Sequence, residues 1–142
     1  MTLYAAYFDD WEVKPKFELA YVSLWPGWLG SERAHELDQV TQQDWSKFNK
    51  WLKLVADDHE VHAANCKFKS TSLIANIDEI LCSYTASMNK ESNDFYRFVL
   101  PDLNCVITED WDYTYIIWHQ NDGAIEKLIP SITSSGLFVF TN

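Results

Sequence analysis

Three short segments in the last third of the chain constrain the fold most strongly, because each has the composition of a β-strand. Residues 95–100 (FYRFVL), 104–108 (NCVIT) and 113–119 (YTYIIWH) are rich in aromatic and β-branched residues, which are enriched in strands. The first run stops at Pro101, which lacks the backbone N–H that a continuing strand would need. These runs predict a sheet with a hairpin between the second and third segments.

Helices are expected on both sides of these strands in the sequence. Thr41 can cap a helix that runs to Asp57, with Asp44 completing a capping box. The apolar residues of this helix repeat at helical spacing, and they are Trp45, Phe48, Trp51, Leu52 and Val55. A similar stripe from Leu73 to Met88 predicts a second helix over 70–88. A third is expected over 124–135.

Proline, glycine and helix-capping residues set the expected bounds of the remaining elements. Pro130 should kink or split the third helix, and Gly136 should end it before a terminal strand at 137–140. Residues 3–8 and 17–25 favour strands, while Ser31 can begin a short helix over 31–40. The sequence therefore predicts one α+β domain spanning residues 1–142. We expect a mostly antiparallel sheet with about three helices packed on it.

The excess of acidic residues limits the kinds of molecule that this protein is expected to bind. Eleven Lys and Arg face 21 Asp and Glu, which gives a formal net charge of −10. No basic residue lies between Arg97 and Lys127. Such a surface repels nucleic acid and anionic membranes, and it attracts a basic protein partner. The apolar runs are shorter than the roughly 20 residues of a membrane-spanning helix, and the N-terminus lacks a basic signal-peptide region. We therefore expect a cytoplasmic protein with reduced cysteines.

Two similar segments place a tryptophan among acids. The first is DDWE (Asp9, Asp10, Trp11 and Glu12), and the second is EDWD (Glu109, Asp110, Trp111 and Asp112). The second lies between two strand-like runs, which places it in a hairpin loop or at a strand end. Carboxylates can steer a cationic partner, and an exposed indole ring can then supply buried area. These eight residues are the predicted partner-binding site.

Two catalytic alternatives follow from the histidines. His119 could pair with Glu109, Asp110 or Asp112 as a general base of a small hydrolase. His59, His62 and Cys66 could hold a metal, although the spacing of the two histidines is one residue short of the H-E-x-x-H motif. No nucleophile elbow, phosphate-binding loop or dinucleotide-binding motif is present in the sequence. We therefore assign no catalytic residue, metal or cofactor.

In size, acidity and lack of a catalytic motif, the chain resembles bacterial immunity proteins, and this resemblance is one of composition alone. It implies a small protein that neutralises a cognate toxin, possibly a nuclease, by covering a cationic surface. A structural or scaffolding domain, whose acidic surface serves only solubility, is the remaining alternative.

Overall fold

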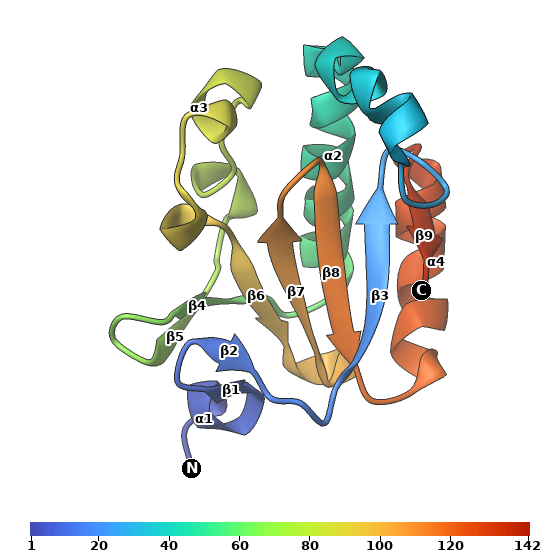
Figure 1. Cartoon of the computed structure of the whole chain (residues 1–142). Coiled ribbons are helices and arrows are strands. Elements are labelled where there is room, and N and C mark those ends of the chain that lie inside the picture. The colour runs from blue at the N-terminus through green and yellow to red at the C-terminus, as the bar shows by residue number, and fades with distance from the viewer.

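Seven strands form one antiparallel sheet in the computed structural model, which describes all residues from Met1 to Asn142. The strand order is β5-β4-β6-β7-β8-β3-β9, so an early strand lies between two late ones (Figure 1). A separate hairpin pairs β1 (Phe8–Asp9) with β2 (Glu12–Val13). The strands of the main sheet are β3 (Glu18–Ser23), β4 (His62–Asn65), β5 (Ser70–Leu73), β6 (Arg97–Leu100), β7 (Cys105–Asp110), β8 (Thr114–His119) and β9 (Phe138–Phe140).

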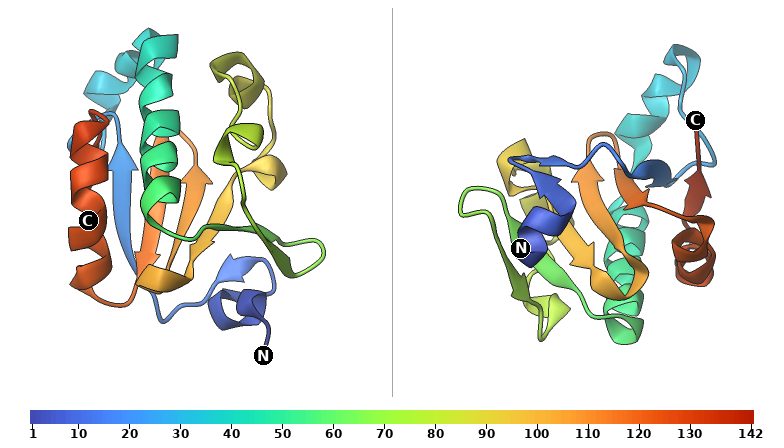
Figure 2. Two further views of the ribbon diagram at one scale, coloured as in Figure 1. Left: turned by 180° about the vertical axis from the view of Figure 1, so that it is seen from behind. Right: turned by 90° about the horizontal axis from the view of Figure 1, so that it is seen from below.

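Two long helices cover one face of this sheet, as the view from behind shows (Figure 2). They are α2 (Gln42–Asp58) and α4 (Asp122–Ser134). The shorter helices are α1 (Leu3–Tyr7) and α3 (Tyr84–Met88), together with the 3₁₀ segments η1 (Ser31–Gln39), η2 (Ile77–Glu79), η3 (Ser92–Asp94) and η4 (Pro101–Leu103). None of the helices combines the length and the apolar character that a membrane span requires.

The main core lies between the sheet and the two long helices. The predicted apolar stripe of α2 is confirmed, because Trp45, Phe48, Trp51, Leu52 and Val55 are all buried. The helix begins with the predicted capping box, in which Thr41 Oγ1 accepts from the Asp44 N–H and the Asp44 carboxylate accepts from the Thr41 N–H. Each bond satisfies a backbone donor that the first turn of a helix leaves free.

A smaller core covers part of the opposite face. Here α1 and the segment after it pack Tyr4, Tyr7, Phe8 and Phe17 against the sheet residues Val99 and Val106. The view from below places this N-terminal segment and α2 on opposite sides of the sheet (Figure 2). Both faces of the middle strands therefore contribute buried apolar area, which is the main stabilising term in folding.

The turn after α4 follows the prediction for Gly136. This glycine has a φ of 82°, and the Leu137 N–H bonds to the Ile132 carbonyl across it. That bond belongs to the Schellman motif, in which a residue without a Cβ is favoured. The expected split at Pro130 is wrong, since α4 runs on from Asp122 to Ser134.

The predicted α+β class and the large antiparallel sheet are confirmed, while two predicted elements are wrong. Residues 70–88 form β5, η2 and α3, and Leu73 and Met88 are exposed. Pairing of 70–73 with β4 outweighs the helical period of this segment. Residues 3–7 form α1, capped by Thr2, because the helical turn brings Tyr4 and Tyr7 onto one buried side.

Candidate functional site

The EDWD segment lies at the tip of the β7–β8 hairpin. Asp110 pairs with Thr114, so residues 111–113 form the loop. Asp112 and Tyr113 have φ values of 58° and 56°, and this left-handed conformation costs a non-glycine residue about 1–2 kcal/mol. The Ser23 hydroxyl, on the neighbouring strand β3, donates to the Tyr113 carbonyl at 3.1 Å. Such strained turns persist where the surrounding structure holds them, and they concentrate at functional sites.

The indole ring of Trp111 projects from this tip. The residue is 61% exposed, and the ring contacts only one other aromatic ring, that of Phe95, with its centroid 4.7 Å away in an edge-on arrangement. Its neighbours Asp110 and Asp112 are exposed and make no ion pair with any Lys, Arg or His. The tip therefore presents a large apolar side chain between two uncompensated negative charges.

A groove of about 430 Å³ separates this tip from the loop that follows β3. Its apolar lining comes from both sides, and we call it the tryptophan groove; it includes Trp25, Trp28, Leu29, Leu37 and Trp111. Trp28 is 54% exposed and packs edge-on against Tyr21 and Phe140 of the sheet. The groove thus has an aromatic wall on the side of the loop after β3 and acids on the hairpin side.

A smaller hollow of about 180 Å³ lies on the other side of the hairpin tip. Met88 and Phe95 contribute to its lining, together with Asp110, Trp111 and Asp112, which also line the tryptophan groove. The EDWD tip is therefore a ridge between two hollows. A partner that covers this ridge would contact both sides of the Trp111 ring.

Further negative charge reaches the tip from η1. Burial raises the pKa of Tyr113 to about 12, with contributions from its contact with the Tyr84 hydroxyl and from the negative charges of Asp38 and Asp112. Asp38 is exposed and without an ion-pair partner. Three uncompensated carboxylates, those of Asp38, Asp110 and Asp112, are thus associated with one end of the sheet.

Glu109 differs from the other acids of its segment. Its carboxylate lies 2.6 Å from the Lys90 ammonium, and the two side chains are only 9% (Lys90) and 7% (Glu109) exposed. The same carboxylate accepts from the Tyr96 N–H at 3.0 Å, and the ammonium lies 3.7 Å from the centre of the Tyr96 ring. In this structure Glu109 anchors the chain beside α3 and is not available to a partner.

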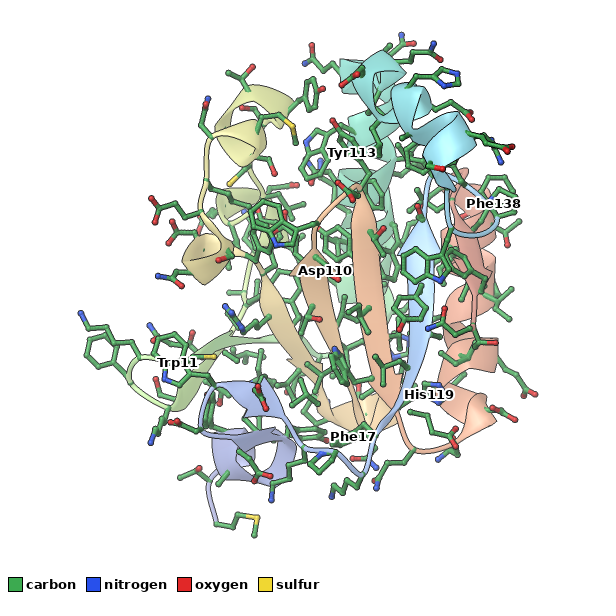
Figure 3. The ribbon with its side chains drawn as sticks, viewed as in Figure 1. Trp11, Phe17, Asp110, Tyr113, His119 and Phe138 are labelled. Atoms are coloured by element: carbon green, nitrogen blue, oxygen red, sulfur yellow. The ribbon has the colours of Figure 1, made fainter.

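The DDWE segment lies apart from EDWD. It forms the β1–β2 turn, where Lys14 lies 3.9 Å from Asp9 and Lys69 lies 3.1 Å from Asp10. Trp11 is 49% exposed and lies beside the β4–β5 hairpin, at a distance along the sheet from Asp110 (Figure 3). The structure therefore does not combine the eight predicted residues into one acidic surface. In the first segment, Asp9 and Asp10 already have basic neighbours, while Glu12 is exposed and makes no ion pair.

The predicted pairing of His119 with the hairpin acids is wrong. Glu109 and Asp110 pair with Tyr115 and Thr114 at one end of β8, whereas His119 pairs with Glu18 at the other end. Figure 3 shows Tyr113, in the hairpin loop, near one end of β8 and His119 near the other. Because a strand rises about 3.3 Å per residue, the intervening length of β8 prevents contact between these side chains.

The predicted metal group at 59–66 is also not assembled. His59 ends α2, His62 lies in β4 with its Nε2 3.0 Å from the Glu60 carboxylate, and Cys66 is buried in the N-terminal core cluster. The ligand atoms of these three residues do not converge; the group of such side chains that does converge in this chain is Glu18, His119 and Asp122.

Comparison of the chain with protein-family models, with curated proteins and with solved structures finds no match. The site must therefore be interpreted from its own chemistry. Sequence reasoning placed Trp111 in it but missed the participation of Trp25 and Leu37, which line the groove. The sequence signal for this part of the site was the pair of tryptophans that flank Pro26 and Gly27. Their position opposite Trp111 depends on strand pairing.

Proposed function

We propose that this protein binds a cationic protein surface at the tryptophan groove and the EDWD tip, and thereby blocks it. One observation carries the proposal: Trp111, 61% exposed, stands between two exposed acids that have no basic partner. An exposed indole beside free carboxylates can hold an Arg or Lys side chain over its face while the carboxylates neutralise the cation.

The groove and the tip supply the two contributions that such binding needs, which are attraction between charges and burial of apolar area. Asp38, Asp110 and Asp112 attract a positively charged surface and raise its association rate. Trp28 and Trp111 then bury apolar area, and a guanidinium over an indole face adds about 0.5–2 kcal/mol. Tryptophan is prominent among the residues that dominate binding energy in interfaces. Charge selects the partner, and aromatic burial keeps it bound.

The most concrete form of this function is that of an immunity-type protein that neutralises a bacterial toxin. A nuclease toxin would present Lys and Arg side chains that normally contact phosphates. Asp110 and Asp112 would take the place of those phosphates, and Trp111 would occlude the site. The net charge of −10 supports this version, because it favours association with basic proteins over nucleic acid.

The test is a capture experiment with immobilised protein and lysate of the native host, followed by elution with salt and identification by mass spectrometry. We expect a basic protein to be retained at low salt and released at high salt, because exposed charge pairs are screened. The same protein should be captured poorly by the variant Asp110→Lys with Asp112→Lys.

A matched control changes the net charge equally at another place. Asp57 and Asp58 are exposed, make no ion pair and end α2, where lysines suit the helix dipole. The variant Asp57→Lys with Asp58→Lys should capture the partner almost as well as the wild type. If both variants capture equally little partner, the interaction depends on net charge alone and not on the hairpin tip. If both capture as much as the wild type, the hairpin tip is not the binding site.

A further inference from the structure

Glu18, His119 and Asp122 bring three potential metal ligands together at the end of the sheet opposite the tryptophan groove. One ligand atom from each side chain lies within 4.8 Å of the other two. Glu18 and His119 are directly paired residues of β3 and β8, and Asp122 is the first residue of α4. Three different elements therefore contribute to one small cluster, whose position is marked by His119 in Figure 3.

The hydrogen bonding of His119 also suits a metal ligand. The residue is only 4% exposed, and its hydrogen bond joins Nδ1 to the Asn121 carbonyl at 3.0 Å. Nε2 makes no hydrogen bond to another protein group and is not fully shielded from solvent, so it remains open to a ligand. Metal-bound histidines typically donate one ring N–H to a carbonyl or carboxylate, which fixes the tautomer and leaves the other nitrogen for the metal. His119 has this arrangement, with two carboxylates nearby.

The connection between β8 and α4 holds the third ligand in place. It consists of Gln120 and Asn121 only. This short connection keeps Asp122 close to His119. The same connection presents the Asn121 carbonyl that orients the imidazole.

We propose that Glu18, His119 and Asp122 bind one zinc-class divalent cation. One imidazole and two carboxylates are ligands that zinc accepts, at about 2.0–2.2 Å. Glu18 and Asp122 are exposed, so their side chains can rotate inward by the distance that coordination requires. Three protein ligands leave a position for water or for a partner's side chain. The bound ion would join the ends of β3, β8 and α4, and this role is separate from the proposed partner binding.

The experiment is titration of metal-free protein with Zn²⁺ by calorimetry, and with Co²⁺ by visible absorption. We expect one ion per chain, a raised melting temperature with Zn²⁺, and cobalt d–d bands without thiolate charge transfer, since no cysteine is in the cluster. Glu18→Gln with Asp122→Asn should weaken affinity at least about tenfold, as even the loss of an outer-shell partner does. His119→Asn should do the same.

The control is Glu60→Gln with His62→Asn, which removes the exposed pair with Nε2 and Oε2 3.0 Å apart and should leave binding unchanged. If His119→Asn does not fold, the double variant Glu18→Gln with Asp122→Asn decides alone, because both positions are on the surface. The proposal is overturned if the wild type binds neither ion, if that double variant binds as well as the wild type, or if the cobalt spectrum shows thiolate ligation.

Discussion

The DDWE and EDWD segments have nearly the same composition and occupy opposite situations. Both form hairpin tips, and both contain an aspartate with positive φ, Asp10 at 56° and Asp112 at 58°. In the first segment, Lys14 and Lys69 lie beside Asp9 and Asp10, and only Glu12 is left without an ion pair. In the second, one acid is buried with Lys90 and the other two are free. Neighbours from distant parts of the chain, and not the segment itself, decide whether its charge is available for binding.

The distribution of basic residues explains this difference. The β4–β5 hairpin carries Lys67 and Lys69, and it lies against the N-terminal segment (Figure 1). The EDWD tip faces η1 and the loop after β3, where Arg33 is already paired with Glu36. The second segment therefore keeps two exposed carboxylates without a basic partner, Asp110 and Asp112, whereas the first keeps one, Glu12.

The largest expected effect is on the free energy of unfolding, and it distinguishes the buried Glu109 from the exposed acids. Lys90→Met leaves the Glu109 carboxylate without its cation, and the loss of one partner of a buried pair costs about 3–5 kcal/mol. We expect a corresponding fall in the free energy of unfolding, measured by urea denaturation. The matched variant Lys14→Met removes a surface pair and should cost less than about 1 kcal/mol. Equal costs would mean that Glu109 is no more structural than Asp9.

A smaller effect concerns partner affinity. Trp111→Ala should weaken binding of the captured partner by about 2 kcal/mol or more, because a central tryptophan of an interface typically contributes this much. Trp11→Ala should leave affinity within about 0.5 kcal/mol of the wild type, since residues outside such a centre are energetically near neutral. Calorimetry with the purified partner measures both. A larger loss at Trp11 would move the site to the other hairpin.

Replacing each of the two aspartates that have positive φ by glycine distinguishes effects on stability from effects on partner binding. Asp10→Gly and Asp112→Gly each relieve a positive φ, which should offset the entropy that glycine adds to the unfolded chain. We expect both to change the free energy of unfolding by less than about 1 kcal/mol, and thermal denaturation measures this. Only Asp112→Gly should lower affinity for the partner. Loss of affinity in both variants would show that binding responds to turn geometry.

The smallest expected effect on stability comes from a variant that should gain binding of a cationic peptide. Lys14→Met with Lys69→Met removes the two ion pairs of the first segment and should alter unfolding by at most about 1 kcal/mol. The freed carboxylates beside Trp11 should then bind a fluorescein-labelled nona-arginine peptide more tightly than the wild type does, as measured by anisotropy at low salt. Unchanged peptide binding would show that basic neighbours are not what distinguishes the segments.

The elements that sequence reasoning could predict are those whose signals are local. Helix α2 carries its cap at Thr41 and its apolar stripe within one stretch, so both were visible. The helix predicted over 70–88 failed because its apparent stripe competes with pairing between 70–73 and β4. Pairing energy comes from another strand, and no local period records it.

The same distinction applies to the candidate sites. The flanking strand-like runs predict that Trp111 lies in a hairpin loop, but its exposure depends on packing that the sequence left open. The groove opposite it requires β3 to lie beside β8, a register in which Ser23 pairs with Thr114. Likewise, Glu18 and His119 meet only through that register. Contacts between residues so far apart in the chain were beyond what one sequence reveals.

The insertion of β3 between β8 and β9 has a consequence for folding. Its partners on both sides are made from the last third of the chain, and such long-range pairing forms slowly. The groove, shared by the loop after β3 and the β7–β8 tip, can exist only once this pairing is complete. A bound partner would therefore hold together contacts between the early and late parts of the chain, and it would slow their opening.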